Sequence, residues 1–403
     1  MESSTGATAS PGPIPRSAPP SEQAAWLARN AVDCLPEGAL AERLALCRPL
    51  RIKLGIDPTA PDIHLGHIVV LQKLREFQDL GHTVVLIIGD YTARVGDPTG
   101  RSELRPVLSG EEIADNARTF QEQASLVLDQ DRLEVLQNSE WLDMTMEDLF
   151  RLARSATLAQ IVEREDFAQR LANQAPISIL ELLYPLLQGY DSVAVKADVE
   201  LGGTDQRFNL LLARDIQRAY GVQEQVVLTM PILPGTDGVR RMGKSLGNYV
   251  GVAEPAEEIY GKTLSIPDSA LSDWYTLLLD RPVPDQTPPR DAKRALARAL
   301  VARSYGEQAA TDAEQAFDRQ FIGGEIPADV PEVSCSRGDG SIHLPALMRA
   351  AFGVSTSEAR RAITQGGVRV DGEVVESLDV RAEEIEGRVL QWGKRRFARV
   401  RVT

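Results

Sequence analysis

The feature that most constrains the fold is a strand, a helix and a second strand in close succession. Residues 51–56 have the pattern of a strand, residues 64–80 that of an amphipathic helix, and residues 83–88 are almost wholly apolar, as in a strand buried on both faces. A helix between two such strands predicts a βαβ unit with parallel strands and a right-handed crossover. We therefore expect an α/β fold.

The rest of the chain extends this unit into a doubly wound parallel sheet. Residues 109–187 are mostly helical and predict an insertion between two halves of the sheet, with a short strand candidate at 133–136. Strand patterns return at 193–195 and 225–230, on either side of a helix from about 206 to 220. These elements predict a Rossmann-like domain.

Pro- and Gly-rich segments divide the remaining chain. The predicted organisation is a disordered tail at 1–20, the α/β domain at 21–252, a helical domain at 253–321, a linker at 322–340 and a small α+β domain at 341–403. The last of these has a helix-turn-helix pattern followed by short alternating strands.

Composition excludes several classes of protein. No stretch approaches the roughly 20 uncharged apolar residues of a membrane-spanning helix, and the first 20 residues lack the features of a targeting signal. Three distant cysteines, Cys34, Cys47 and Cys335, form no CxxC pair, which argues against a disulfide framework or a thiolate zinc site. We expect a cytoplasmic protein without a membrane role.

Charge is unevenly distributed along the chain. Residues 341–403 contain eleven Lys and Arg against eight Asp and Glu, a net +3, whereas the whole chain carries −14 and the preceding residues therefore −17. A basic end on an acidic body fits a polyanion that is held at one place rather than along the whole surface.

The segment His64-Leu65-Gly66-His67 opens a helix directly after the first strand and a turn with two prolines. A helix N-terminus offers unpaired N–H groups and partial positive charge, so it suits an ATP phosphate, and the glycine permits close approach. The alternative is that both histidines only cap the helix. A metal site is less favoured, because no cysteine or third histidine stands nearby.

A second candidate phosphate site is Arg241-Met242-Gly243-Lys244-Ser245, in a loop after the last apolar strand. Arg and Lys here can neutralise the charge that develops on departing pyrophosphate. Alone the signal is weak, since short basic loops are usually solvated surface. The loop follows the strand and helix of the first candidate site in the chain, and this order strengthens the interpretation as a phosphate site.

These two segments resemble the signatures of a known family. HLGH is similar to the HIGH signature, and RMGKS to the KMSKS loop, of class I aminoacyl-tRNA synthetases. The resemblance implies a Rossmann-like catalytic domain, ATP with Mg²⁺ as co-substrate, no tightly bound protein metal site, and transfer of the aminoacyl group to the 2′-hydroxyl of the tRNA. It also places the helical domain on the anticodon side.

A polar stripe indicates the amino acid. Tyr184, Gln188 and Asp191 are spaced i, i+4 and i+7, so a helix would align all three toward one pocket suited to a phenol. The alternative is that they only cap or line a helix. This stripe and the segment GGTDQ at 202–206 resemble the tyrosyl-tRNA synthetase family, and the similarity extends from about Leu27 to the end.

The resemblance implies a role for individual residues. The tyrosine-binding residues it implies are Asp97, Tyr184, Gln188, Asp191 and Gln206, with Asp191 accepting the phenolic hydroxyl and Gln206 near the carboxylate. The ATP-binding residues are Gly55, Asp57, Gly66, Gly203, Asp205, Met242, Gly243, Lys244 and Ser245. The catalytic residues, which stabilise charge on the phosphates, are Thr59, His64, His67, Arg101, Arg241 and Lys244.

The sequence departs from the family pattern at three positions. Lys53 stands where many bacterial members have a tyrosine that contacts the phenol, so Asp191 is expected to carry more of the recognition, or Asp90 to assist. Arg241 replaces the first lysine of KMSKS, which keeps the charge and changes its geometry. Gly243 replaces the middle serine and should loosen the loop.

The segment from Thr356 to Gly372 resembles an S4 RNA-binding module. Arg360 and Arg361 on a short helix, and Arg369 beyond a glycine turn, would meet tRNA phosphates. The Asp371-Gly372 pair predicts a tight hairpin turn. The alternative is an ordinary basic surface.

The predicted function is that of a tyrosine–tRNA ligase acting on L-tyrosine, ATP and tRNA(Tyr). We also expect a homodimer, from the resemblance and from apolar helix faces in the insertion that include Leu149, Leu152, Leu158 and Ile161. Two alternatives stay open: a tryptophanyl or other HxGH adenylating enzyme, and an RNA-binding or splicing-helper protein on a synthetase scaffold.

Overall fold

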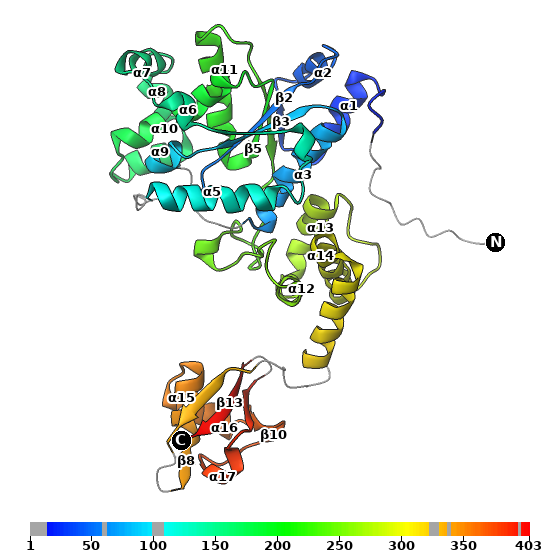
Figure 1. The fold of residues 1–403 in the computed structure, drawn as a ribbon, viewed down its shortest axis with the longest axis vertical. Helices are drawn as coiled ribbons and strands as arrows, with labels where there is room; N and C mark the ends of the chain where they lie inside the picture. Colours follow the sequence, from blue (N-terminus) through cyan, green and yellow to red (C-terminus); the bar gives the residue numbers. More distant parts are fainter. Residues whose placement is uncertain (1–13, 59–62, 99–108, 322–329, 337–339, 394–395) are drawn as a thin grey trace, which may run out of the picture. The chain divides into compact units, whose positions relative to one another are not determined.

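The computed structural model describes residues 14–58, 63–98, 109–321, 330–336, 340–393 and 396–403. The chain forms two compact units, residues 1–307 and 308–403 (Figure 1). Among the described residues, no helix is both long enough and apolar enough to cross a membrane.

A six-stranded sheet forms the centre of the larger unit, with the strand order β1-β6-β5-β2-β3-β4. Neighbouring strands are parallel except for β1, which runs antiparallel to β6. The strands are β1 (Asp33–Leu35), β2 (Arg51–Ile56), β3 (Thr83–Ile88), β4 (Leu133–Gln137), β5 (Val199–Gly203) and β6 (Val226–Met230). Five residues of β3 are buried, because helices cover both faces of the sheet.

The order of the strands reverses between β2 and β5. From β2 the chain passes through α3 (Leu65–Asp79) to β3 on one side, and from β5 through α11 (Arg207–Ala219) to β6 on the other. Right-handed crossovers in opposite directions put α3 and α11 on opposite faces of the sheet (Figure 1). Ligands of doubly wound sheets bind at such a reversal, beside the carboxyl ends of the strands.

Further helices surround the sheet. Before and between its strands lie α1 (Pro20–Leu27), α2 (Ala39–Leu44), α4 (Thr92–Val95), α5 (Gly110–Ala124), α6 (Ser139–Leu142), α7 (Met146–Ala153), α8 (Leu158–Val162), α9 (Glu165–Ala172) and α10 (Ile179–Ala194). After it follow α12 (Ala256–Leu264), α13 (Leu271–Leu279) and α14 (Pro289–Phe321). Gly306 interrupts α14 with a φ of 87°, close to where the two units divide.

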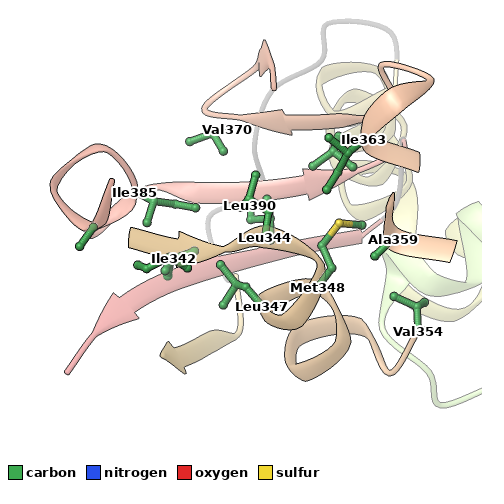
Figure 2. Close-up of a cluster of buried hydrophobic side chains, with 13 residues drawn as sticks. Ile342, Leu344, Leu347, Met348, Val354, Ala359, Ile363, Val370, Ile385 and Leu390 are labelled. Atoms are coloured by element: carbon green, nitrogen blue, oxygen red, sulfur yellow. The ribbon is translucent and has the colours of Figure 1, made fainter. Parts of the chain in front are cut away.

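The smaller unit combines a five-stranded sheet, ordered β10-β9-β12-β13-β7, with a two-stranded ribbon of β8 and β11. Its elements are β7 (Glu332–Cys335), β8 (Ser341–His343), α15 (Leu344–Phe352), α16 (Thr356–Thr364), β9 (Val368–Val370), β10 (Glu373–Val374), β11 (Asp379–Arg381), α17 (Ala382–Ile385), β12 (Val389–Trp392) and β13 (Arg396–Val402). Figure 2 shows its core, where Met348 and Ile363 of the two main helices and Leu390 of the sheet are fully buried.

These elements confirm the predicted fold class, a mostly parallel Rossmann-like sheet followed by a helical region and a small α+β domain. The strand predicted at 193–195 is wrong, because α10 continues to Ala194 and β5 begins only at Val199. The predicted insertion at 109–187 contains β4, which pairs with β3 in the sheet. The domain boundaries stay a prediction.

Candidate active site

Two histidines form the start of α3. His64 is the N-cap: its Nδ1 accepts a hydrogen bond from the Gly66 N–H at 3.2 Å, and its own N–H donates to His67 Nδ1 at 3.2 Å. The ring centroids are 4.0 Å apart. The capping role raised as an alternative is therefore present, and it fixes both rings at the position predicted for ATP.

Both imidazoles are neutral at physiological pH. Burial, together with the nearby Lys244 ammonium, lowers the pKa of His64 to about 2 and that of His67 to about 4. Neutral rings can donate hydrogen bonds to a phosphate or ribose without a permanent charge.

The RMGKS loop lies beside this helix start. A Cβ built on Gly66 would lie 3.7 Å from Met242 Cβ, and a few residues beyond the loop Gly251 pairs with His64 in an antiparallel bridge. Within the loop, the Gly243 N–H donates to Asn248 Oδ1 at 2.9 Å. The structure thus brings together the two segments that the sequence assigned separately to phosphates.

Asn248 holds the base of that loop, a role the sequence analysis did not foresee. It is buried, and its side-chain amide donates to Asp237 Oδ2 at 2.9 Å and to the Arg241 carbonyl at 3.1 Å. Met242 is buried as well, which anchors the middle of the loop. No sequence signal marked Asn248, because its role depends on the folded shape of the loop.

Asp57 follows the end of β2, at the reversal of strand order. Its Oδ2 accepts from the Tyr184 hydroxyl at 3.0 Å, and its Oδ1 from Thr92 Oγ1 at 2.7 Å. Burial and the charge of Asp57 raise the pKa of Tyr184 well above its usual value, so its O–H stays available as a donor. Asp57 thereby joins the end of β2 to α10.

Asp191 lies on the same face of α10 as Tyr184 and is also buried. Its Oδ1 accepts from Trp141 Nε1 at 2.8 Å, and its Oδ2 from Asn138 Nδ2 at 3.4 Å. Burial raises the pKa of Asp191 to about 6. Because this value is still below 7, the carboxylate is mostly ionised at neutral pH, and it retains lone pairs for a further donor.

A chain of amide contacts connects the other predicted tyrosine-binding residues. Asn209 Nδ2 donates to Gln188 Oε1 at 2.9 Å and to Gln206 Oε1 at 3.0 Å. Gln206 Nε2 in turn donates to Asp97 Oδ2 at 2.9 Å. Arg164 donates to Asn209 Oδ1 at 3.1 Å and lies 3.7 Å from Asp97 Oδ1. The four side chains and the arginine form one network.

Arg164 and Asn209 were not assigned a role from the sequence, although Asn209 closely follows the GGTDQ segment at 202–206. Thr92 was missed too, since nothing in its local sequence marks it.

Two of the predicted ATP-binding residues, Gly203 and Asp205, lie at the end of β5 and just after it. Asp205 Oδ2 is 3.4 Å from Arg241 Nη1 of the RMGKS loop. Burial, and then the nearby Asp97 charge, raise the pKa of Asp205. A Cβ built on Gly203 would lie 2.6 Å from Asp205 Oδ1, whereas one built on Gly55 would meet no described atom within 4 Å. Gly55 thus leaves space beside the end of β2.

Lys53 stands at the position of the family's phenol-contacting tyrosine, and Asp90 was considered as a second residue for the phenol. In the structure both have other partners. Lys53 is fully buried and lies 2.8 Å from Glu200 Oε1, beneath α10. Asp90 Oδ1 accepts from the Ser139 N–H at 2.9 Å. Two further predicted residues, Thr59 and Arg101, lie outside the described residues.

In the smaller unit, Arg360, Arg361 and Arg369 are exposed. Within the described residues none of them forms an ion pair, and Arg369 donates to the Gly372 carbonyl at 3.1 Å. Asp371 and Gly372 both have positive φ (46° and 88°), as the predicted hairpin turn requires.

The apolar face expected for dimerisation needs a correction. Leu152 and Ile161 are buried inside the larger unit, so they cannot meet a second chain. The exposed apolar side chains of this region are Leu126, Met146, Phe150, Leu158, Leu171, Ile179 and Leu180.

Comparisons with known families agree with this geometry. Residues 45–321 match the family described as tRNA synthetases class I (W and Y), and residues 344–384 match the S4 domain. The chain therefore belongs to the class I aminoacyl-tRNA synthetases, and specifically to the branch for tryptophan and tyrosine.

Relatives narrow the assignment. The chain is 50% identical over 391 residues to the tyrosine–tRNA ligase of Moorella thermoacetica, covering 93% of this chain and 94% of that one. It is 49% identical over 393 residues to the tyrosine–tRNA ligase of Thermotoga maritima, covering 94% and 98%. Its activity is that of a tyrosine–tRNA ligase.

A solved structure supports the fold. The tyrosyl-tRNA synthetase of Archaeoglobus fulgidus, crystallised in complex with L-tyrosine, aligns with a TM-score of 0.60 at 25% identity, covering 73% of this chain and 98% of that one.

Proposed function

We propose that the larger unit activates L-tyrosine at the reversal of strand order and that the smaller unit binds tRNA(Tyr). The observation that carries this assignment is an unbroken chain of polar contacts that runs from Tyr184 through Asp57, Thr92 and Asn138 to Asp191. A cytoplasmic location is part of the same proposal.

Tyrosine binds along α10 in this proposal. Asp191 accepts the phenolic hydroxyl, because it is a buried carboxylate at the inner end of the stripe. Tyr184, Gln188 and Asp97 hold the ammonium group, and Gln206 lies near the carboxylate. The contacts of Gln188, Gln206 and Asp97 with one network support their action on the same end of the substrate.

ATP binds between the ends of β2 and β5 and the start of α3. Gly55, Asp57 and Gly66 line the nucleotide on one side, and Gly203 and Asp205 meet the ribose on the other. Met242, Gly243 and Ser245 shape the loop over the phosphates. ATP brings Mg²⁺ with it as a co-substrate, and we assign no side chain of this chain to the metal.

In the reaction, the tyrosine carboxylate attacks the α-phosphorus, and pyrophosphate departs in line. The protein contributes little covalent chemistry. His64, His67, Arg241 and Lys244 stabilise the charge that grows on the leaving phosphates, and Thr59 and Arg101 are assigned to the same task from the sequence alone. The tyrosyl group then passes to the terminal adenosine of the tRNA.

The smaller unit holds tRNA through Arg360, Arg361 and Arg369. All three are exposed cations without an ion pair among the described residues, which suits phosphate contacts.

We also propose a homodimer. The exposed Met146, Phe150 and Leu158 provide apolar surface that a second chain would cover. Sedimentation at micromolar concentration should give about twice the chain mass of 44.0 kDa. A single species at the chain mass would refute the dimer.

The test of the activation site is amino-acid-dependent ATP–pyrophosphate exchange with all twenty amino acids, on the wild-type enzyme and on Gln188→Ala. Tyrosine alone should support exchange, and the variant should raise the KM for tyrosine more than that for ATP. An equal effect on both substrates would contradict the assignment of Gln188.

A further inference from the structure

A buried ion pair lies beneath the phenol end of the proposed pocket. Lys53 on β2 and Glu200 on β5 are partners in the parallel register, and their side chains are 0% and 1% exposed. Lys53 Nζ lies 2.8 Å from Glu200 Oε1. Removing two charges from water costs several kcal/mol per ion, and apolar residues of similar volume often stabilise a protein as well or better. A role beyond stability is therefore to be sought for this pair.

The contacts of Lys53 are directed at α10. Its Nζ donates to the Gln188 carbonyl oxygen at 2.9 Å and to Ser192 Oγ at 2.7 Å. These two residues bracket Asp191 along the helix. Ser192 Oγ in turn donates to Glu200 Oε2 at 3.0 Å. The ammonium group is thus fixed against the turn of α10 that carries the proposed phenol acceptor.

The ionisable groups that face Asp191, two of them charged, come from three elements. Lys53 approaches from β2, Glu200 from β5, and the neutral Tyr184 hydroxyl lies on α10 itself. The groups on the remaining side, Asn138 and Trp141, are uncharged donors.

We propose that Lys53 and Glu200 are positioning residues that together set the charge of Asp191 and, through it, the preference for a phenol over a phenyl ring. The inference rests on the proposed role of Asp191 as the acceptor of the phenolic O–H. The ammonium of Lys53 favours the ionised carboxylate, and Glu200 opposes it. A hydrogen bond to an ionised acceptor is roughly twice as strong as one between neutral groups, and phenylalanine has no donor to form it.

The electrostatics of Asp191 agree with this arrangement. Burial raises its pKa to about 6, the Lys53 charge lowers it, and the Glu200 charge raises it. The two members of the pair therefore act on Asp191 with opposite signs.

Because the two charges act on Asp191 in opposite directions, replacing each of them separately tests the proposal. The dissociation constants of tyrosine and phenylalanine would be measured by equilibrium dialysis without ATP, from pH 5 to 8, for wild type, Lys53→Met, Glu200→Gln and the double variant. Wild-type tyrosine binding should tighten roughly fivefold to tenfold as pH rises through a midpoint near 6. Phenylalanine binding should show no such gain.

Lys53→Met should raise the midpoint, because the Lys53 charge acts to lower the pKa of Asp191. Glu200→Gln should lower it, and the double variant should return it toward the wild-type value. A general packing defect would weaken binding in both single variants without moving the midpoints apart. Midpoints that stay unchanged, or that move in the same direction, overturn the proposal.

Two controls keep the outcome decisive. If Lys53→Met does not fold, as judged by circular dichroism, Glu200→Gln alone still has to lower the midpoint. Asp191→Asn should abolish the pH dependence. If the dependence persists in that variant, the proposed role of Asp191 fails; if it disappears while Glu200→Gln leaves the midpoint unmoved, only the role of the pair fails.

Discussion

Gly89 follows β3 and lies against Asp57 and Thr92. Any larger residue at this position would displace these two side chains. A Cβ at this position would lie 2.2 Å from Asp57 Oδ1 and 2.4 Å from Thr92 Oγ1, whereas real Cβ atoms essentially never approach closer than 3.0 Å. Asp57 accepts hydrogen bonds from Thr92 and Tyr184, so Gly89→Ala must disturb both.

The magnitude follows from these contacts. The Asp57 carboxylate has to retreat by about 0.8 Å, the difference between 3.0 and 2.2 Å. Overpacking of this kind costs about 1 to 3 kcal/mol, and each weakened hydrogen bond about 1 kcal/mol more. For a unit of this size, a total of about 3 to 5 kcal/mol corresponds to a fall in Tm of about 5 to 8 °C.

The assay compares Gly89→Ala with a matched control, Gly261→Ala. Gly261 lies inside α12, where an added Cβ meets no described atom within 4 Å, so that variant should be neutral or stabilising by up to about 1 kcal/mol. Thermal melting and tyrosine-dependent ATP–pyrophosphate exchange would be measured for both. Gly89→Ala should lose about tenfold or more in kcat/KM for tyrosine. Wild-type Tm and activity in this variant would refute the reasoning.

Three further predictions concern other parts of the chain. Lys244→Ala should slow adenylate formation by about 10²- to 10³-fold while tyrosine affinity stays nearly intact; equal losses in both, in pre-steady-state and binding assays, would contradict its role at the leaving phosphates. Replacing Arg360 and Arg361 together by Ala should weaken tRNA binding and reduce its salt slope by about one counterion per lost phosphate contact, and an unchanged slope would indicate an ordinary basic surface. Tm should fall as pH falls from 6.5 toward 4, because burial lowers the pKa of His82 to about 4 and the unfolded chain therefore takes up protons first; His82→Asn should flatten this dependence, and an equally steep profile would speak against it.

Much of the fold follows from local pattern. The βαβ unit at 51–88 was predictable because the first strand has a strand pattern, the second is almost wholly apolar, and the helix between them has a clear period. The sequence missed β1, which is three residues long and is defined only by its pairing with β6. It also misplaced a strand at 193–195, where apolar residues that end α10 have the same composition as a short strand.

The site residues likewise fall into those that local sequence predicted and those that it did not. HLGH, RMGKS and the stripe on α10 were visible because each is contiguous or follows helical spacing. Asn248, Thr92 and Asn209 were not, since each acts through a partner that only the fold brings near. Lys53 was noticed as a departure, but its burial against Glu200 depends on the register between β2 and β5, which no local pattern reveals.

The most direct test of the account is the ratio of kcat/KM for tyrosine over phenylalanine in wild type and in Asp191→Asn. A discrimination of roughly 10⁵-fold against phenylalanine is a known property of this enzyme family. Loss of a hydrogen bond to a charged acceptor, about 1.5 to 3 kcal/mol, should reduce the ratio by roughly 10- to 100-fold through the tyrosine value. A ratio that stays at its wild-type value in a folded variant would contradict the assignment of Asp191 as the phenol acceptor.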